Sequence, residues 1–229
     1  MPTEFSYQLT DSNIYAHLLY RIHQADAEKI DEAEFLLTLE NSTKIANEKL
    51  QHKDCNIVVL ADSDGVIPEE GLGAHAWGSD YIRIFVDPNT SIGLKTAIKK
   101  YLPGAIAHEL HHSRRSLDIG YGHTLGEALI SEGLAQVFQE DLYPDVEVLY
   151  AHNLSESELK DAWAEVKMIL DSTEYDHDSW FFGSEKIKRW TGYSLGYDIV
   201  RKYISRHSEE NATTLIDTPA KTLLDGYKS

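Results

Sequence analysis

Two histidines four residues apart, inside an apolar segment, constrain this chain of 229 residues more than any other feature. His108 and His112 enclose Glu109, and the preceding segment 102–107 is mostly apolar. Residues four apart on an α-helix lie one turn above each other, so both imidazoles would point the same way. Buried imidazoles need polar partners, and a single Zn²⁺ would serve both of them. We therefore predict a helix over residues 103–116 that carries two metal ligands.

Glu109 is placed beside the histidine pair rather than in it. From that position its carboxylate can reach a water molecule at the metal and accept its proton without binding the metal itself. His111 carries a third imidazole, but it is turned away from the midline of the pair, so we expect it to pack or to support a ligand. The alternative for these histidines is a role without metal, as polar groups on a helix surface or as hydrogen-bonded core residues.

A catalytic zinc ion usually has three protein ligands, and Glu132 is the best candidate for the third. It is the one charged residue in the apolar segment 128–138, which predicts a buried helix. A buried carboxylate must be protonated, paired or bound to a metal. Pairing with Arg114 or Arg115 is the alternative that involves no metal.

Three nearby residues compete with Glu132 for the third position. Glu127 is rotated from Glu132 by about 140° on the same helix, so we expect it to face solvent or to support a ligand. The longer zinc motif H-E-x-x-H-x-x-G-x-x-H is not present, because Arg115 occupies its glycine position and Asp118 its last histidine position. Asp118 stays open as an oxygen ligand, and His123 as a nitrogen ligand.

The composition is that of a folded, acidic protein. Hydrophobic residues make up 42% of the chain, enough for a core. The 21 Lys and Arg against 38 Asp and Glu give a net charge of −17, which argues against nucleic-acid binding. Cys55 is the single cysteine, so no internal disulfide can form, and neither a signal sequence nor a membrane-spanning apolar run is present. We therefore expect a cytoplasmic protein with no membrane or nucleic-acid partner.

The spacing of apolar residues in the first half of the chain predicts helices followed by a small sheet. Asp11 is a candidate cap for helical spacing that extends over residues 11–50. Short strands are expected at 57–60, 74–77 and 81–86. The apolar residues with helical spacing are Ile14, Leu18, Leu19, Ile22, Ile30, Phe35, Leu36 and Leu39.

From residue 91 onward the pattern is helical, with a break near Tyr101. We predict helices over residues 124–142, from a capping box at Ser155 and Glu158 towards residue 170, and after Gly192. Helices, a small sheet and further helices describe an α+β fold that is mostly helical. No linker or repeat divides the chain, so we expect a single domain, residues 1–229. Its N-terminal lobe (1–117) would hold the sheet and the histidine helix, and its C-terminal lobe (118–229) would be helical.

Three segments together resemble a bacterial family of unknown function predicted to be zinc-dependent proteases, and the pattern is similar to gluzincins. These segments are 108–112, 131–135 and 192–197, with the sequences HELHH, SEGLA and GYSLGY, and the resemblance extends over roughly residues 70–206. In gluzincins, a glutamate ligand follows on a second helix about twenty residues after the histidines, and Glu132 lies 20 positions after His112. The resemblance implies a zincin-like catalytic domain.

The same resemblance implies a role for each site residue. His108, His112 and Glu132 would bind one zinc ion per chain, and Glu109 would act as the general base on a water molecule. Gluzincins commonly use a Tyr or His to stabilise the oxyanion, and here Tyr193 is the first candidate, with Tyr197 in reserve. The alternative for both tyrosines is packing in a helical row with Val200 and Ile204.

The implied function is a zinc peptidase that acts on a peptide or protein substrate. In many zincins an edge strand pairs with the substrate, and the expected strand 81–86 is suitably placed, with His75, Trp77 and Arg83 as cleft residues or as ordinary strand residues. One alternative is a weakly active or inactive zincin fold used for protein interaction. Another is a metal-dependent hydrolase of non-peptide amides. The sequence does not indicate an oligomeric state.

Overall fold

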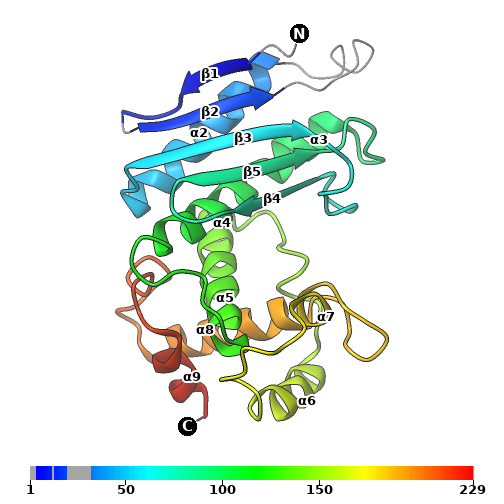
Figure 1. The fold of residues 1–229 in the computed structure, drawn as a ribbon, viewed down its shortest axis with the longest axis vertical. Coiled ribbons are helices and arrows are strands. Elements are labelled where there is room, and N and C mark those ends of the chain that lie inside the picture. The colour runs from blue at the N-terminus through cyan, green and yellow to red at the C-terminus, as the bar shows by residue number, and fades with distance from the viewer. Residues whose placement is uncertain (1–3, 12, 20–31, 229) are drawn as a thin grey trace. The chain divides into compact units, whose positions relative to one another are not determined.

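A computed structural model describes residues 4–11, 13–19 and 32–228 of the chain (Figure 1). The chain forms two compact units, an N-terminal unit (Met1–Leu117) and a C-terminal unit (Asp118–Ser229). The N-terminal unit contains a mixed sheet with helices, and the described part of the C-terminal unit is helical. The predicted α+β class is confirmed. The organisation as a single domain stays a prediction.

The N-terminal unit is built on a five-stranded sheet with the order β1-β2-β3-β5-β4. The central strands β2, β3 and β5 are parallel, and β1 and β4 pair antiparallel to them at the two ends. The strands predicted near residues 57–60, 74–77 and 81–86 are confirmed. The five strands are β1 (Glu4–Gln8), β2 (Asn13–Leu19), β3 (Asp54–Ala61), β4 (Leu72–Ala76) and β5 (Tyr81–Val86).

Strand β2 corrects the sequence prediction, because a helix was expected over these residues. Ile14 and Leu18 are four residues apart, a spacing that suits a helix but also the period of two of a strand. Ile14 and Ala16 are fully buried, whereas Tyr15 between them is partly exposed. The strand pairs along its whole length with β3, far ahead in the sequence. That long-range pairing decides the conformation, and local spacing does not reveal it.

Within the part of this unit that the structure describes, three helices accompany the sheet, and α2 and α4 pack against each other. Helix α2 (Glu32–Leu50) buries Phe35 and Leu39, as their spacing predicted, whereas Ile22 and Ile30 lie outside the described residues. After α3 (Leu94–Lys100), Tyr101 separates it from α4 (Leu102–Arg115), at the predicted break. Helix α4 packs against α2 and against strands β4 and β5. The sheet therefore supports α4 directly.

The position of β5 in the sheet differs from the expectation that it would be an edge strand. It lies between β3 and β4, so both of its sides are paired. The outer strand next to β5 is β4, which runs antiparallel to it. Sequence alternation indicates the buried and exposed faces of a strand, but it does not indicate which strand lies at the edge.

The C-terminal unit consists of five described helices. Helix α5 begins with a capping box between Thr124 and Glu127, and α6 begins with the predicted box between Ser155 and Glu158. Helix α6 ends about four residues before the predicted end, because turns follow it. The helices are α5 (Leu125–Leu142), α6 (Glu156–Val166), α7 (His177–Phe181), α8 (Thr191–Arg206) and α9 (Ala220–Lys228).

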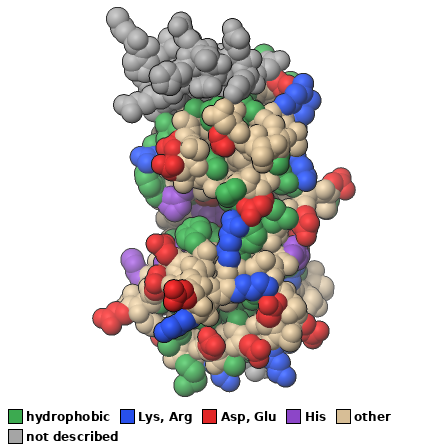
Figure 2. Space-filling model, turned by 90° about the vertical axis from the view of Figure 1, so that its right-hand side faces the viewer, with side chains coloured by type: hydrophobic (Ala, Val, Ile, Leu, Met, Phe, Trp, Pro, Cys, Tyr) green, Lys and Arg blue, Asp and Glu red, His purple; other side chains and the backbone are tan. Residues whose placement is uncertain are grey.

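The surface carries the acidic character of the composition. Acidic side chains are spread over the visible face in Figure 2, with Lys and Arg side chains among them, although the net charge is −17. Among the described residues, every helix is too short or too polar to cross a lipid bilayer.

Helices α5 and α8 approach each other closely where two glycines meet. A Cβ atom built on Gly133 would lie 2.2 Å from the carbonyl oxygen of Gly196. A Cβ atom on Gly196 would lie 2.2 Å from the carbonyl oxygen of Leu129. Both obstacles are backbone atoms, which cannot move aside as a flexible side chain can. The two glycines therefore set the distance between the helices.

We expect Gly196→Ala to lower the free energy of unfolding by roughly 1–3 kcal/mol, because the added methyl group forces the two helices apart. Urea unfolding followed by circular dichroism would measure the change. Ser205→Ala, at an exposed position of the same helix, is the matched control and should stay within about 0.5 kcal/mol of the wild type. Equal stability of Gly196→Ala and the wild type would contradict the close crossing.

Candidate metal centre

Helix α4 presents its two histidines as a facing pair. The side chains of His108 and His112 come from successive turns, and their Nε2 atoms lie 3.0 Å apart. Both residues are buried, with 6% and 8% of their surface exposed. Two buried ring nitrogens that face one another provide two metal-binding lone pairs on one side of the helix.

Polar contacts hold the second half of α4 against the sheet. Ser113, next to His112, donates a hydrogen bond of 2.8 Å from its hydroxyl to the carbonyl oxygen of Ser79, in the loop between β4 and β5. The same hydroxyl lies 3.0 Å from Nε2 of His52, whose ring is buried. Burial lowers the pKa of His52, so the ring is neutral and can share this network without a charge. These contacts fix the rotation of the helix and with it the direction of the histidine pair.

Glu109 is held by the outer strand of the sheet. Its Oε2 atom accepts a hydrogen bond of 2.6 Å from the backbone N–H of Ala76, in β4. Only 7% of the Glu109 surface is exposed. The backbone N–H of Ala76 therefore orients the carboxylate of Glu109. Glu109 directly follows His108 in the sequence.

Glu132 lies on helix α5, where its neighbours along the helix are buried and mostly apolar. It is 6% exposed. Glu127, the local competitor, instead accepts hydrogen bonds from the backbone N–H groups of His123 (2.8 Å) and Thr124 (3.0 Å). These bonds lower the pKa of Glu127 and commit its carboxylate to the start of the helix.

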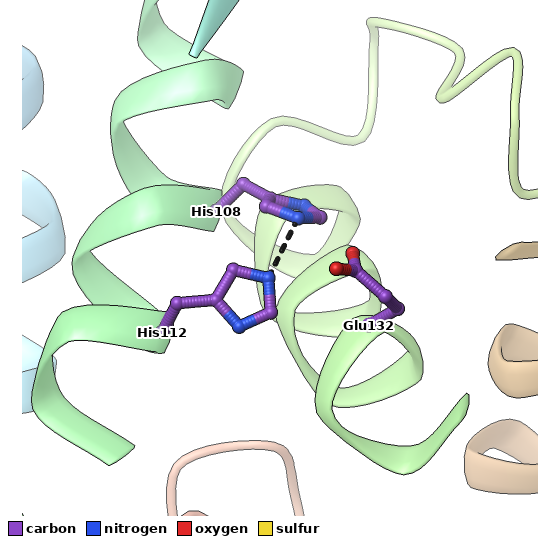
Figure 3. Close-up of side chains that lie close together, drawn as sticks. All are labelled: His108, His112 and Glu132. Carbon is purple, nitrogen blue, oxygen red and sulfur yellow. Dashed lines mark hydrogen bonds between the residues drawn. The ribbon is translucent and has the colours of Figure 1, made fainter. Parts of the chain in front are cut away.

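The ligand atoms of His108, His112 and Glu132 all lie within 4.8 Å of one another (Figure 3). Asp118, His123 and Glu127 are not part of this group. Two imidazole nitrogens and one carboxylate oxygen are a donor set that suits zinc and leaves a fourth position open. The residues present therefore fit a catalytic zinc ion.

The two candidate tyrosines have different surroundings on α8. Tyr193 is partly exposed, and its ring packs against Tyr150 (centroids 5.1 Å apart) and Phe181 (5.0 Å). Tyr197 instead donates a short hydrogen bond to the Glu140 carboxylate and accepts one of 3.0 Å from Nε of Arg201. Burial and the Glu140 carboxylate raise the pKa of Tyr197 to about 12. The hydroxyl of Tyr197 is thus engaged in an ion-pair network.

The residues His75, Trp77 and Arg83 gather on the sheet face opposite to α4. His75 and Arg83 are partners in the register of β4 and β5, and they alternate with the buried residues of that sheet. The Arg83 guanidinium lies 3.9 Å from the centre of the Trp77 ring. Because α4 packs against the other face, these contacts fit the ordinary strand packing that was one of the two expectations, and a place in a substrate cleft stays a prediction.

Two residues near these side chains were not identified from the sequence. Tyr121 precedes α5, and burial and the nearby Glu132 carboxylate raise its pKa well above the usual value. Glu70 precedes β4 and is 4% exposed, and burial raises its pKa to about 7 although His108 acts in the opposite direction. Both lie in loops without a periodic pattern, so only their tertiary neighbours reveal them.

A family described as "Predicted Zn-dependent protease (DUF2268)" matches residues 36–225 of the chain. A crystal structure of an aminopeptidase N family protein from Idiomarina loihiensis is similar in fold, with a TM-score of 0.51 and 10% sequence identity. The similarity covers 94% of this chain and 40% of that protein, so the chain spans less than half the length of this neighbour. At this identity the likeness shows the fold alone. No curated protein matches the chain.

We expect Glu70→Gln to change the pH dependence of stability in the metal-free protein. The pKa of Glu70 is about 7 when folded and near 4.5 when unfolded, so the wild type loses stability as the pH rises from about 4.5 to 7. The variant lacks this loss, and its advantage should grow by on the order of 1–3 kcal/mol between pH 4 and pH 8. Chemical denaturation at both pH values would measure it. Exposed Glu69→Gln is the control, and an identical pH profile for both variants would contradict the burial of Glu70.

Proposed function

Because the chain belongs to the family of predicted Zn-dependent proteases (DUF2268), we propose that it is a zinc peptidase with His108, His112 and Glu132 as metal ligands. The observation that carries the proposal is the approach of the three ligand atoms to within 4.8 Å of one another. All three side chains are buried, so a shared cation would offset the cost of removing them from water. We propose one zinc ion per chain.

Glu109 is the general base in this proposal. Bound to the three ligands, zinc would polarise the scissile carbonyl and make water more acidic. Glu109 takes the proton from the attacking water and then delivers it to the amine of the leaving peptide. The N–H of Ala76 holds Oε2 of Glu109, which keeps the carboxylate in one orientation during both transfers. A fixed base needs little reorganisation, which favours rapid proton transfer.

Tyr193 is the residue that we propose to stabilise the oxyanion. Its ring is held by Tyr150 and Phe181, and the residue is partly exposed, so a substrate group can approach it. Tyr197 is the weaker candidate, because Glu140 and Arg201 already occupy its hydroxyl. A donor aimed at the developing negative charge stabilises the transition state more than the bound substrate, and this lowers the barrier.

The substrate in this proposal is a peptide or protein segment in extended conformation. Strand β4 is one of the two outer strands of the described sheet and contacts Glu109 through Ala76. An outer strand can pair with an extended peptide through main-chain hydrogen bonds, which would bring the peptide alongside Glu109. This assignment moves the substrate strand from β5, as expected from the sequence, to β4. A cytoplasmic location stays a prediction.

Chelation and Glu109→Gln together test the proposed function. A chelator should abolish cleavage of a peptide library by the wild type, and added Zn²⁺ should restore it. Glu109→Gln should lower kcat/KM by roughly 10²–10⁴-fold while the protein still binds one zinc ion, because only the base is lost. Mass spectrometry of the peptide products measures cleavage, and elemental analysis measures the zinc content of the protein.

The matched control is Glu127→Gln, which alters a carboxylate on α5 that caps the helix. It should retain zinc and cleave the library. Stoichiometric zinc in the wild type without cleavage of any peptide would contradict the peptidase and favour either an interaction role or hydrolysis of other amides. Undiminished cleavage by Glu109→Gln would contradict the assigned base.

Tyr193→Phe and Tyr197→Phe separate the two tyrosines. Tyr193→Phe should lower kcat by roughly 10²–10³-fold with little change in KM, because a donor to the oxyanion acts only in the transition state. Tyr197→Phe should mainly lower thermal stability, because it removes a hydrogen bond from the Glu140 and Arg201 network. Steady-state kinetics and thermal unfolding distinguish these effects, and the reverse pattern would assign the catalytic role to Tyr197.

A further inference from the structure

The outer edge of strand β4 has an open hydrogen-bonding position. In an antiparallel ladder, hydrogen-bonded pairs alternate with pairs whose N–H and C=O groups point away from the partner strand. The N–H of Trp77 donates to the carbonyl oxygen of Tyr81 at 2.7 Å, so His75, two residues earlier, also bonds inward to β5. Ala74 and Ala76 therefore turn their N–H and C=O groups outward.

Two hydrogen bonds at this edge agree with the alternation. The N–H of Ala76 donates to Oε2 of Glu109 at 2.6 Å. The carbonyl oxygen of Leu72 accepts from the N–H of Ile67 at 2.9 Å. Among the described residues, Ala74 between them has no partner on this side. An extended peptide that pairs with Ala74 would therefore continue the sheet immediately beside the residue that holds Glu109.

The two faces of the sheet give the side chains of such a peptide different surroundings. Side chains alternate between the two faces along a strand. A peptide residue opposite Ala74 points to the face on which Ile84 is buried and against which α4 packs. Its two neighbours in the peptide point to the other face, where His75, Trp77 and Arg83 lie. The side chains of these neighbours therefore meet polar and aromatic groups instead of the core.

Arg83 is fixed on this face with part of its guanidinium unused. The guanidinium lies 3.9 Å from the centre of the Trp77 ring, so the side chain extends from β5 over the end of β4. Its Nε donates a hydrogen bond of 3.1 Å to the hydroxyl of Tyr81. Within the described part of the chain, no carboxylate pairs with Arg83. Its two terminal nitrogens are therefore left to bind an anion.

A guanidinium with two free terminal nitrogens is complementary to a carboxylate, which it binds through two parallel hydrogen bonds. Trp77 is 49% exposed, so the stacked pair is open to a ligand. The ring covers one face of the guanidinium and restricts its rotamers, which lowers the entropy lost on binding. The chain carries a net charge of −17, so a fixed arginine without an acidic partner is not part of a generally basic surface.

We propose that Arg83, positioned by Trp77, determines substrate specificity by binding a carboxylate of the substrate. The inference rests on the proposed function, since it requires a peptide paired with β4. The carboxylate belongs to an acidic side chain that points away from α4, or to the C-terminus of a peptide that ends at this position. Arg83 takes no part in bond cleavage, so it acts on KM more than on kcat.

The test uses octapeptides with acetylated and amidated ends, in which Glu or Gln occupies each position in turn. At one position, the wild type should cleave the Glu peptide with a kcat/KM roughly 5–20-fold higher than the Gln peptide, an effect between those of an exposed ion pair and a buried charged hydrogen bond. Arg83→Gln should remove this preference by raising KM for the Glu peptide. Gln peptides with a free C-terminus form a separate arm. A preference for them over the amidated peptides, lost in Arg83→Gln, would assign the carboxylate to the chain end.

Two further variants define what Arg83 contributes. Arg83→Lys keeps the charge but lacks the planar fork, so it should retain only part of the preference. Arg189→Gln is the matched control, because Arg189 is an exposed arginine whose guanidinium lies 3.8 Å from the centre of the Trp190 ring. It should keep the ratio of the wild type between Glu and Gln peptides. Circular dichroism checks that each variant is folded.

The outcomes separate this inference from the peptidase proposal. Equal kcat/KM for Glu and Gln peptides with free and amidated ends would overturn the inference and leave the peptidase intact, as would an unchanged preference in Arg83→Gln. If the wild type cleaves none of these peptides, the peptidase proposal fails, and isothermal titration calorimetry measures their binding instead. Tighter binding of carboxylate-bearing peptides that depends on Arg83 would then support the carboxylate site, and its absence would overturn both proposals.

Discussion

Three buried side chains that could together hold a metal ion are the constraint on which the rest of this structure depends. His108, His112 and Glu132 are each less than a tenth exposed, and their ligand atoms lie within 4.8 Å of one another. Removing a carboxylate and two imidazoles from water is costly, and an apolar core would not retain them without a partner. In the proposed function a divalent cation would satisfy all three groups at once, which would account for polar groups at positions that an ordinary helix fills with leucine.

Helix α4 and its Glu109 side chain are held by groups that are not candidate metal ligands. The network of Ser113, Ser79 and His52 fixes the rotation of α4, and the strand N–H of Ala76 holds Glu109. Such support restricts side chains that have several rotamers to one, which is what separates a set of suitable residues from a preorganised site. The sheet and its loops thus restrict the orientation of candidate site residues without providing candidate ligands themselves.

The parts that could be predicted are those with a strong local signal. The capping box at Ser155, the helix that follows Thr124, the break at Tyr101 and the strand alternation at 81–86 each depend on neighbours within a few residues. Strand β2 was missed because its spacing fits two periods, and only pairing with β3 distinguishes them. The edge strand was misassigned for a related reason, since strand order depends on contacts between distant segments.

By itself, the sequence determined the chemistry that is available to this protein. Helical periodicity places His108 and His112 on one face, and a lone charge in an apolar helix marks Glu132 as a residue that needs a partner. Only the tertiary structure decided which further groups lie near them. Ala76 contacts Glu109 from a strand at the edge of the sheet. Glu70 and Tyr121 lie in loops, near His108 and Glu132 respectively. Side-chain spacing along one element follows from the backbone geometry of that element, whereas neighbours from different elements follow from packing, which no local pattern encodes.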